Sequence, residues 1–224
     1  MANPVYVAID IGDLTSATRV VTAVAPHVGG IKLGLEFFMA NGPDGVRRLA
    51  ALGLPVFLDV KLHDIGNTMA GAARALAPLG CAIVNVHAAA GPAAMAAVRD
   101  ALPPATAVVA VTVLTSFDRD DLDRIGVAGD VADQVARLAA LTRAAGLQGV
   151  VCAGGEIAAV RGAWPDAVTV VPGLRPSGGK AGDQKRVMTP RAARDAGASV
   201  LVVGRPITAA ADPAAAAAAI AATL

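Results

Sequence analysis

Acidic and basic residues alternate over one short stretch, Asp59-Val-Lys-Leu-His-Asp64, directly after the apolar residues 55–58. Alternate residues of a β-strand lie on one face, with Cα atoms about 7 Å apart, so we expect Asp59 and Lys61 to share one space. A strand of a parallel sheet is almost continuously apolar, and charges at its C-terminal end then indicate a site rather than a solvated face. A surface ion pair at the end of a strand is the plain alternative, and the remaining sequence decides between the two.

Eight short apolar runs alternate with segments of helical periodicity, which predicts eight βα units. We expect strands at residues 5–10, 30–34, 56–62, 82–88, 107–114, 149–153, 168–173 and 200–204. We expect helices at residues 14–25, 43–52, 67–79, 92–101, 131–145, 156–162, 189–196 and 206–222. Because the composition does not change along the chain, the pattern predicts an α/β protein with a single (β/α)8 TIM barrel over residues 1–224. A doubly wound sheet ranks second, because the turn Ile9-Asp-Ile-Gly-Asp13 lacks the Gly-rich sequence typical of that fold.

The composition excludes several classes of function. The formal net charge is +1, and the chain has one Trp, one Tyr and four Phe, so we expect no binding of nucleic acid. No apolar run reaches membrane-spanning length without a charge, Gly or Pro, and we expect no membrane contact. The sequence starts without a basic segment followed by an apolar one, which predicts a cytoplasmic protein. The two cysteines, Cys81 and Cys152, form no zinc-ligand spacing, so we expect neither a disulfide nor a structural metal.

Polar residues at the C-terminal ends of the predicted strands are the candidates for a site, because a TIM barrel gathers its catalytic groups there. Lys and Asp residues in such a place can neutralise one another as an alternating array with a fixed electrostatic field. The plain alternatives are a helix cap for Asp10, a solvent-reaching side chain for Lys32 and a structural histidine for His87. The candidates are Asp10, Lys32, Asp59, Lys61, Asp64, Asn85, His87, Thr115, Ser116, Arg175 and Arg205.

A phosphate site is predicted independently at Gly204-Arg205-Pro206. Barrels commonly bind phosphate between the loops after strands seven and eight, where a helix N-terminus supplies backbone N–H groups. Arg205 starts the last helix and can hold a phosphate with two hydrogen bonds. The polar, Gly-rich segment 175–186 is too long for an ordinary turn and predicts a mobile lid, from which Arg175 and Gln184 could close over the phosphate.

Taken together, these motifs resemble the orotidine 5′-phosphate decarboxylase family. The stretch Leu58-Asp-Val-Lys-Leu-His-Asp-Ile-Gly-Asn-Thr68 looks like the family signature. Further matches follow in order at Ala8-Ile-Asp10, Ile31-Lys-Leu-Gly34, Val84-Asn-Val-His-Ala88, Val111-Thr-Val-Leu-Thr-Ser116, Pro172-Gly-Leu-Arg-Pro176, Gly182-Asp-Gln184, Arg186-Val-Met-Thr-Pro190 and Val203-Gly-Arg-Pro-Ile-Thr208. The chain departs from the family pattern at Gly66, where proline is usual, and at Ala153-Gly154, which replaces a Ser-containing turn.

The resemblance implies decarboxylation of orotidine 5′-phosphate to uridine 5′-phosphate, the last step of de novo UMP synthesis, with no metal and no organic cofactor. It implies that Lys61 donates a proton to C6 of the pyrimidine and acts with Asp59, Asp64 and Lys32 as the catalytic set. It also implies a homodimer, in which Asp64, Ile65 and Thr68 complete the partner's site.

The resemblance further assigns residues to the parts of the nucleotide substrate. Asp10 and Lys32 would bind the ribose hydroxyls, and Thr115 and Ser116 the edge of the pyrimidine. The phosphate would be bound by Gln184, Gly204 and Arg205. The complete predicted set of substrate contacts is Asp10, Lys32, Ile65, Thr68, Thr115, Ser116, Pro172, Arg175, Gln184, Gly204 and Arg205.

Two other functions stay open at this point. A Mg²⁺-dependent sugar-phosphate decarboxylase or aldolase of the same suprafamily shares the D-x-K-x-x-D strand end, but it needs a carboxylate on strand two, where this chain has Lys32. A catalytically silent nucleotide-binding protein would bind uridine 5′-phosphate without turnover. The intact set of Asp59, Lys61 and Asp64 argues against that third hypothesis.

Overall fold

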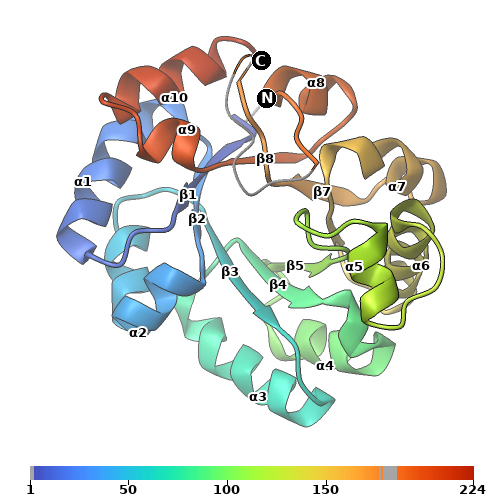
Figure 1. Cartoon of the computed structure of the whole chain (residues 1–224). Coiled ribbons are helices and arrows are strands. Elements are labelled where there is room, and N and C mark those ends of the chain that lie inside the picture. The colour runs from blue at the N-terminus through green and yellow to red at the C-terminus, as the bar shows by residue number, and fades with distance from the viewer. Residues whose placement is uncertain (1–2, 177, 179–185) are drawn as a thin grey trace.

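Eight parallel strands close into a barrel, in the order β1-β2-β3-β4-β5-β6-β7-β8. The computed structural model describes residues 3–176, 178 and 186–224. Helices surround the strands on the outside of the barrel (Figure 1). The strands are β1 Val5–Ile9, β2 Gly30–Leu33, β3 Val56–Leu62, β4 Ile83–His87, β5 Ala107–Val111, β6 Gly149–Val151, β7 Val168–Val171 and β8 Val200–Val203. The predicted (β/α)8 TIM barrel is therefore confirmed.

Successive strand residues alternate between two apolar clusters, one inside the barrel and one between the strands and the helices. Ile31 and Leu33 of β2 belong to the outer cluster, so Lys32 between them faces the barrel interior. Phe57 of β3 belongs to the inner cluster, and Asp59, two residues later, lies on the same face. The inner cluster closes the barrel beneath these charges and consists of Ala8, Phe57, Ile83, Val109, Val111, Val151, Val170, Val200 and Val202.

The helices follow the predicted alternation with the strands. Their bounds are α1 Leu14–Val24, α2 Leu35–Ala50, α3 Gly66–Leu76, α4 Pro92–Ala101, α5 Arg119–Arg124, α6 Val131–Ala144, α7 Ile157–Ala163, α8 Pro190–Asp195, α9 Arg205–Thr208 and α10 Pro213–Ala221. None of the helices in the described part of the chain combines the length and the apolarity that a membrane crossing requires.

Two of the helix predictions were wrong, and one helix was missed. The second helix begins at Leu35 rather than at residue 43. Gly42, with φ 59°, kinks this helix without ending it. A glycine followed by Pro43 has the sequence pattern of a helix start, which explains the difference. The short helix α5 was not predicted. The helix predicted at residues 206–222 is divided into α9 and α10, because the Asp212 side chain accepts a hydrogen bond from Ala215 N and starts a new helix.

Both cysteines are buried free thiols. Burial raises the pKa of Cys81 to about 11. Burial also raises the pKa of Cys152 to about 12, against the opposing effect of Arg186 and Arg161. Neither thiol is therefore a thiolate at neutral pH.

Candidate active site

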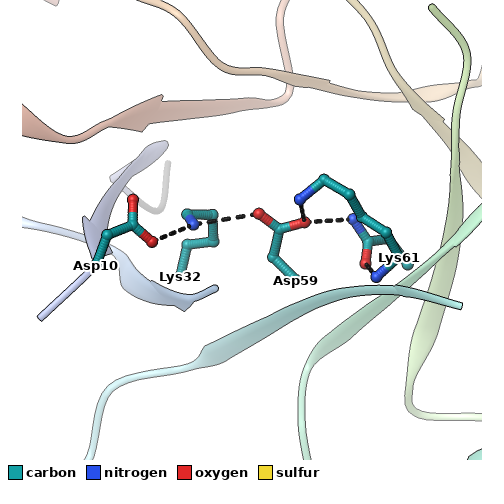
Figure 2. Close-up of polar contacts among 5 residues, drawn as sticks. Asp10, Lys32, Asp59 and Lys61 are labelled. Carbon is teal, nitrogen blue, oxygen red and sulfur yellow. Dashed lines mark hydrogen bonds and ion pairs between the residues drawn. The ribbon is translucent and has the colours of Figure 1, made fainter. Parts of the chain in front are cut away.

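Four charged side chains from the first three strands form a continuous row of ion pairs inside the barrel mouth (Figure 2). Lys32 Nζ lies 2.9 Å from Asp10 Oδ1 and 3.1 Å from Asp59 Oδ2. Lys61 Nζ lies 2.6 Å from Asp59 Oδ1. The structure thus brings together the predicted array of Asp10, Lys32, Asp59 and Lys61.

Exposure increases toward both ends of this row. The side chains of Lys32 and Asp59 are 9% and 12% exposed, while those of Lys61 and Asp10 are 30% and 51% exposed. Burial by itself lowers the pKa of Lys32, but the carboxylates of Asp59 and Asp10 outweigh it and raise that pKa above its usual value. Lys32 therefore stays an ammonium at neutral pH and fixes both neighbouring carboxylates.

Gly34 leaves room for the ion pair between Lys32 and Asp10. A Cβ atom at Gly34 would lie 2.5 Å from Asp10 Oδ1 and 2.7 Å from Lys32 Nζ, both closer than van der Waals contact. Glycine is therefore needed at position 34 because it has no Cβ atom, and not because the backbone has an unusual φ angle.

Replacing Gly34 with Ala should lower kcat/KM about 10- to 100-fold, because a displacement near 1 Å at a reacting centre has an effect of that size. Steady-state kinetics with the substrate that the family resemblance implies would measure it. Gly155 has no atom within 4 Å of an added Cβ, so Gly155→Ala is the matched control. Equal kinetics for the two variants would contradict the proposed need for space at Gly34.

The strand that carries Asp59 and Lys61 is irregular where these residues lie. β3 pairs regularly with β4 as far as Leu58, and the register then shifts before Leu62. Lys61 has φ 50°, and among the described residues other than glycine it alone has a positive φ. The sequence predicts a regular strand here, so this irregularity is a difference between expectation and structure.

Two neighbouring cavities meet at this row of charges, and they share Lys32, Asp59, Pro172 and Val202. The first, of about 270 Å³, has Lys61, Thr115 and Ser116 at its polar positions and apolar side chains elsewhere. Its remaining walls are Phe57, Val111, Val113, Leu114, Val151, Cys152 and Val170. Such a cavity suits a planar ring with a polar edge.

The second cavity, of about 440 Å³, is lined mainly by polar and charged groups. It contains Asp10, Arg175, Gly204 and Arg205, together with Glu36, which the sequence analysis did not include. Its two guanidinium groups suit a phosphate, and the carboxylate of Asp10 suits hydroxyl groups. The two cavities together therefore have the polarity pattern of a nucleotide.

Asp64, Ile65 and Thr68 are not part of either cavity of the chain as described. All three are exposed, and Ile65 is 71% exposed. Asp64 Oδ1 accepts a hydrogen bond from Ile65 N at 2.6 Å. Asp64 and Ile65 instead line an open groove with His63, Gly66, Ala89, Ala90, Ala93 and Ala94.

The predicted lid at 175–186 falls largely outside the described residues, and so does Gln184. At its start, Arg175 N donates a hydrogen bond at 3.0 Å to O of Met188, two residues beyond its end. Arg186 forms an ion pair with the buried Glu156 and donates to Leu114 O at 2.9 Å. Sequence reasoning gave Arg186 and Glu156 no role, since 30 residues separate them and neither lies at a strand end.

The donor set was tested for a metal site. In the described part of the chain, no cluster of three or more His, Cys, Asp or Glu side chains is arranged to hold a metal ion. Asp10 and Asp59 are the carboxylates that would attract a divalent cation, and the Lys32 ammonium lies between them within 3.1 Å of each. These residues therefore do not fit a Mg²⁺ ion.

Comparisons with known proteins identify the family of the chain. The profile of the "Orotidine 5'-phosphate decarboxylase / HUMPS family" matches residues 3–220. Orotidine 5′-phosphate decarboxylases from Novosphingobium aromaticivorans and Sphingopyxis alaskensis are 56% and 55% identical over the full length of both chains. The crystal structure of orotidine 5′-phosphate decarboxylase from Lactobacillus acidophilus has 34% identity and a TM-score of 0.86, covering 99% of this chain and 98% of the other. The resemblance read from the sequence is thus confirmed, and the chain belongs to the orotidine 5′-phosphate decarboxylase / HUMPS family.

Proposed function

We propose that this protein decarboxylates orotidine 5′-phosphate to uridine 5′-phosphate without a metal or an organic cofactor, and that Lys61 donates the proton to C6. The observation that carries the proposal is the row of ion pairs from Asp10 to Lys61, which ends with an ammonium group lining an apolar cavity. The names of the full-length relatives support the same substrate.

Loss of CO2 from C6 leaves an electron pair that no neighbouring carbonyl can delocalise directly. Stabilisation of such a transition state can approach roughly 23 kcal/mol, which requires several contributions. Lys61 supplies two of them: its positive charge stabilises the developing carbanion, and its proton then forms the new C6–H bond. The neutral amine regains a proton from solvent before the next turnover.

Asp59 has a double role in this proposal. It holds the Lys61 ammonium at 2.6 Å, which orients the proton donor. Its negative charge also lies beside the space for the substrate carboxylate, and the repulsion between the two disappears as CO2 leaves. Lys32 offsets part of that charge, so the array remains compatible with folding.

The two cavities support an assignment of the parts of the nucleotide to the residues around them. We place the pyrimidine in the apolar cavity against Thr115 and Ser116, and the ribose beside Asp10 and Lys32. The phosphate then lies at Gly204 and Arg205, with Pro172 and Arg175 along the wall. Gln184 and the closure of a lid over residues 175–186 are proposed from the sequence alone.

We also propose that the active unit is a homodimer in which Asp64, Ile65 and Thr68 complete the partner's site. Their exposure, and the fact that they line neither cavity of their own chain, support this. Ile65 shows why assembly is favourable, because a large apolar side chain that is 71% exposed gains stability when it is covered.

A direct decarboxylation assay, with and without a chelator, tests the proposed function. We expect the absorbance of the orotate ring to fall at the same rate in both samples. Activity on a sugar phosphate that the chelator abolishes would favour the Mg²⁺-dependent alternative, although the ammonium of Lys32 between two carboxylates argues against it. Binding of uridine 5′-phosphate with no turnover of orotidine 5′-phosphate would identify a silent nucleotide-binding protein.

Replacing Arg205 with Ala should lower kcat/KM for orotidine 5′-phosphate roughly 100-fold or more, because charge-assisted hydrogen bonds to phosphate are lost. Binding energy from the phosphate also organises the reacting end, so we expect kcat to fall as well as KM to rise. The control substrate is orotidine, which has no phosphate and should react equally slowly with both enzymes. An equal loss on both substrates would refute the phosphate role.

A further inference from the structure

We propose that Asn85 is a positioning residue of this active site, which holds both Asp59 and Lys61 across the irregular end of β3. The inference rests on the proposed function, because the geometry it protects is that of the proposed proton donor. Asn85 lies in the middle of β4 and is 0% exposed, so its amide cannot be satisfied by bulk solvent.

Both halves of the Asn85 amide are used, and each contacts a different member of the charged row. Asn85 Oδ1 accepts a hydrogen bond from the backbone N–H of Lys61 at 2.8 Å. Asn85 Nδ2 donates to Asp59 Oδ1 at 2.6 Å. One planar group therefore fixes the backbone of the proton donor and the carboxylate that orients its side chain.

The irregular pairing explains why a side chain is needed at this place. The partners of Val84 and Val86 in β4 are Leu58 and Leu62 in β3. An advance of two residues along β4 thus matches an advance of four residues along β3. The residues of β3 between these two pairs include Asp59 and Lys61. The Lys61 N–H lies within this extra stretch, and a side chain oxygen accepts its hydrogen bond.

Asn85 also stabilises the unusual backbone conformation of Lys61. A φ of 50° is disfavoured for a residue with a Cβ, and it persists only where surrounding contacts determine it. The hydrogen bond to Asn85 is such a contact. Without it, Lys61 is free to return to an extended conformation, which moves its ammonium group relative to Asp59.

The carboxylate of Asp59 is held in the same way from several sides. Its Oδ1 contacts Lys61 Nζ and Asn85 Nδ2, each at 2.6 Å, and its Oδ2 contacts Lys32 Nζ at 3.1 Å.

Two substitutions at position 85 separate these contacts from the space that the side chain fills. Leucine has a shape similar to that of asparagine but forms neither hydrogen bond. Aspartate keeps the acceptor for Lys61 N–H but, when ionised, loses the donor and places a second negative charge against Asp59.

The first test compares Asn85→Leu with the wild type in steady-state kinetics and in binding of uridine 5′-phosphate. We expect kcat to fall at least about 100-fold, while KM and the affinity for uridine 5′-phosphate change less than about threefold, because the binding groups lie on other strands. The control is Thr106→Val, which removes another buried hydrogen bond, from Thr106 Oγ1 to Cys81 O, away from both cavities. It should lower the melting temperature similarly and leave kcat unchanged.

The second test is the pH profile of Asn85→Asp, which also answers the question if the leucine variant does not fold. Only the protonated form of the new carboxyl group can donate to Asp59, so kcat relative to the wild type should rise as pH falls. A profile parallel to that of the wild type, or an unchanged kcat for Asn85→Leu, would overturn the positioning role. An inactive wild-type enzyme would instead refute the proposed function, so the two failures are distinguishable.

Discussion

Replacing Lys61 with Ala should lower kcat by at least about 10⁴-fold, because in the proposed mechanism the change removes both a general acid and a positive charge at the carbanion. The fold should survive, since Asp59 keeps Lys32 Nζ at 3.1 Å and Asn85 Nδ2 at 2.6 Å. Affinity for uridine 5′-phosphate should also survive, because the product has no carboxylate at C6. Kinetics, circular dichroism and calorimetric binding of uridine 5′-phosphate measure the three quantities.

The matched control for that variant is Arg47→Ala. Arg47 forms an ion pair with Asp44 of the same 2.6 Å length as the pair of Lys61 and Asp59, but both side chains are exposed, at 53% and 89%. Its loss should leave kcat unchanged. A residual kcat for Lys61→Ala within about tenfold of the wild type would show that another group donates the proton.

Mixing Asp64→Ala subunits with Lys61→Ala subunits should restore about a quarter of the wild-type activity, although each variant alone is nearly inactive. Random exchange makes half of the dimers mixed, and each mixed dimer has one site with both Lys61 and the partner's Asp64. Co-refolding at equal concentrations, followed by the decarboxylation assay, measures the recovery.

The control for the mixing experiment uses a subunit with both substitutions. When this subunit is mixed with the Asp64→Ala subunit, every site lacks Asp64, so no activity should be restored. Full activity of the Asp64→Ala variant alone would show that Asp64 does not complete a site. If both variants are inactive and mixing brings no recovery, the site is not shared between subunits in the proposed way.

The fold and most of the charged array were predictable from the sequence, because both depend on local periodicity. Lys32 lies between two apolar residues of one short strand, so its side chain is expected to face the barrel interior. The side chain of Asp59 is expected to face the interior because Phe57, two residues earlier, does so. The irregular end of β3 could not be predicted, because it depends on pairing with β4, 24 residues further on. Asn85 is a visible polar residue in an apolar strand, but its role becomes apparent only with its two partners in place.

The same limit applies to the loops that surround the cavities. Arg186 and Glu156 pair across a separation that no local pattern encodes. The start of α2 was missed because a local pattern was misleading. Gly42 and Pro43 have the sequence pattern of a helix start, whereas residues 35–41 already form the first turns of this helix. The assignment of Asp64, Ile65 and Thr68 stays a prediction, since it concerns a second subunit.

The row from Asp10 to Lys61 contains two carboxylates and two ammonium groups, so its formal charges cancel. A neutral row attracts a multiply charged nucleotide only weakly from a distance, and its buried members are little affected by dissolved ions. The guanidinium of Arg205, by contrast, is exposed to the solvent and its dissolved ions. In the proposed binding mode, ionic strength therefore acts mainly on capture of the substrate phosphate, whereas the buried part of the row is largely shielded from dissolved salt.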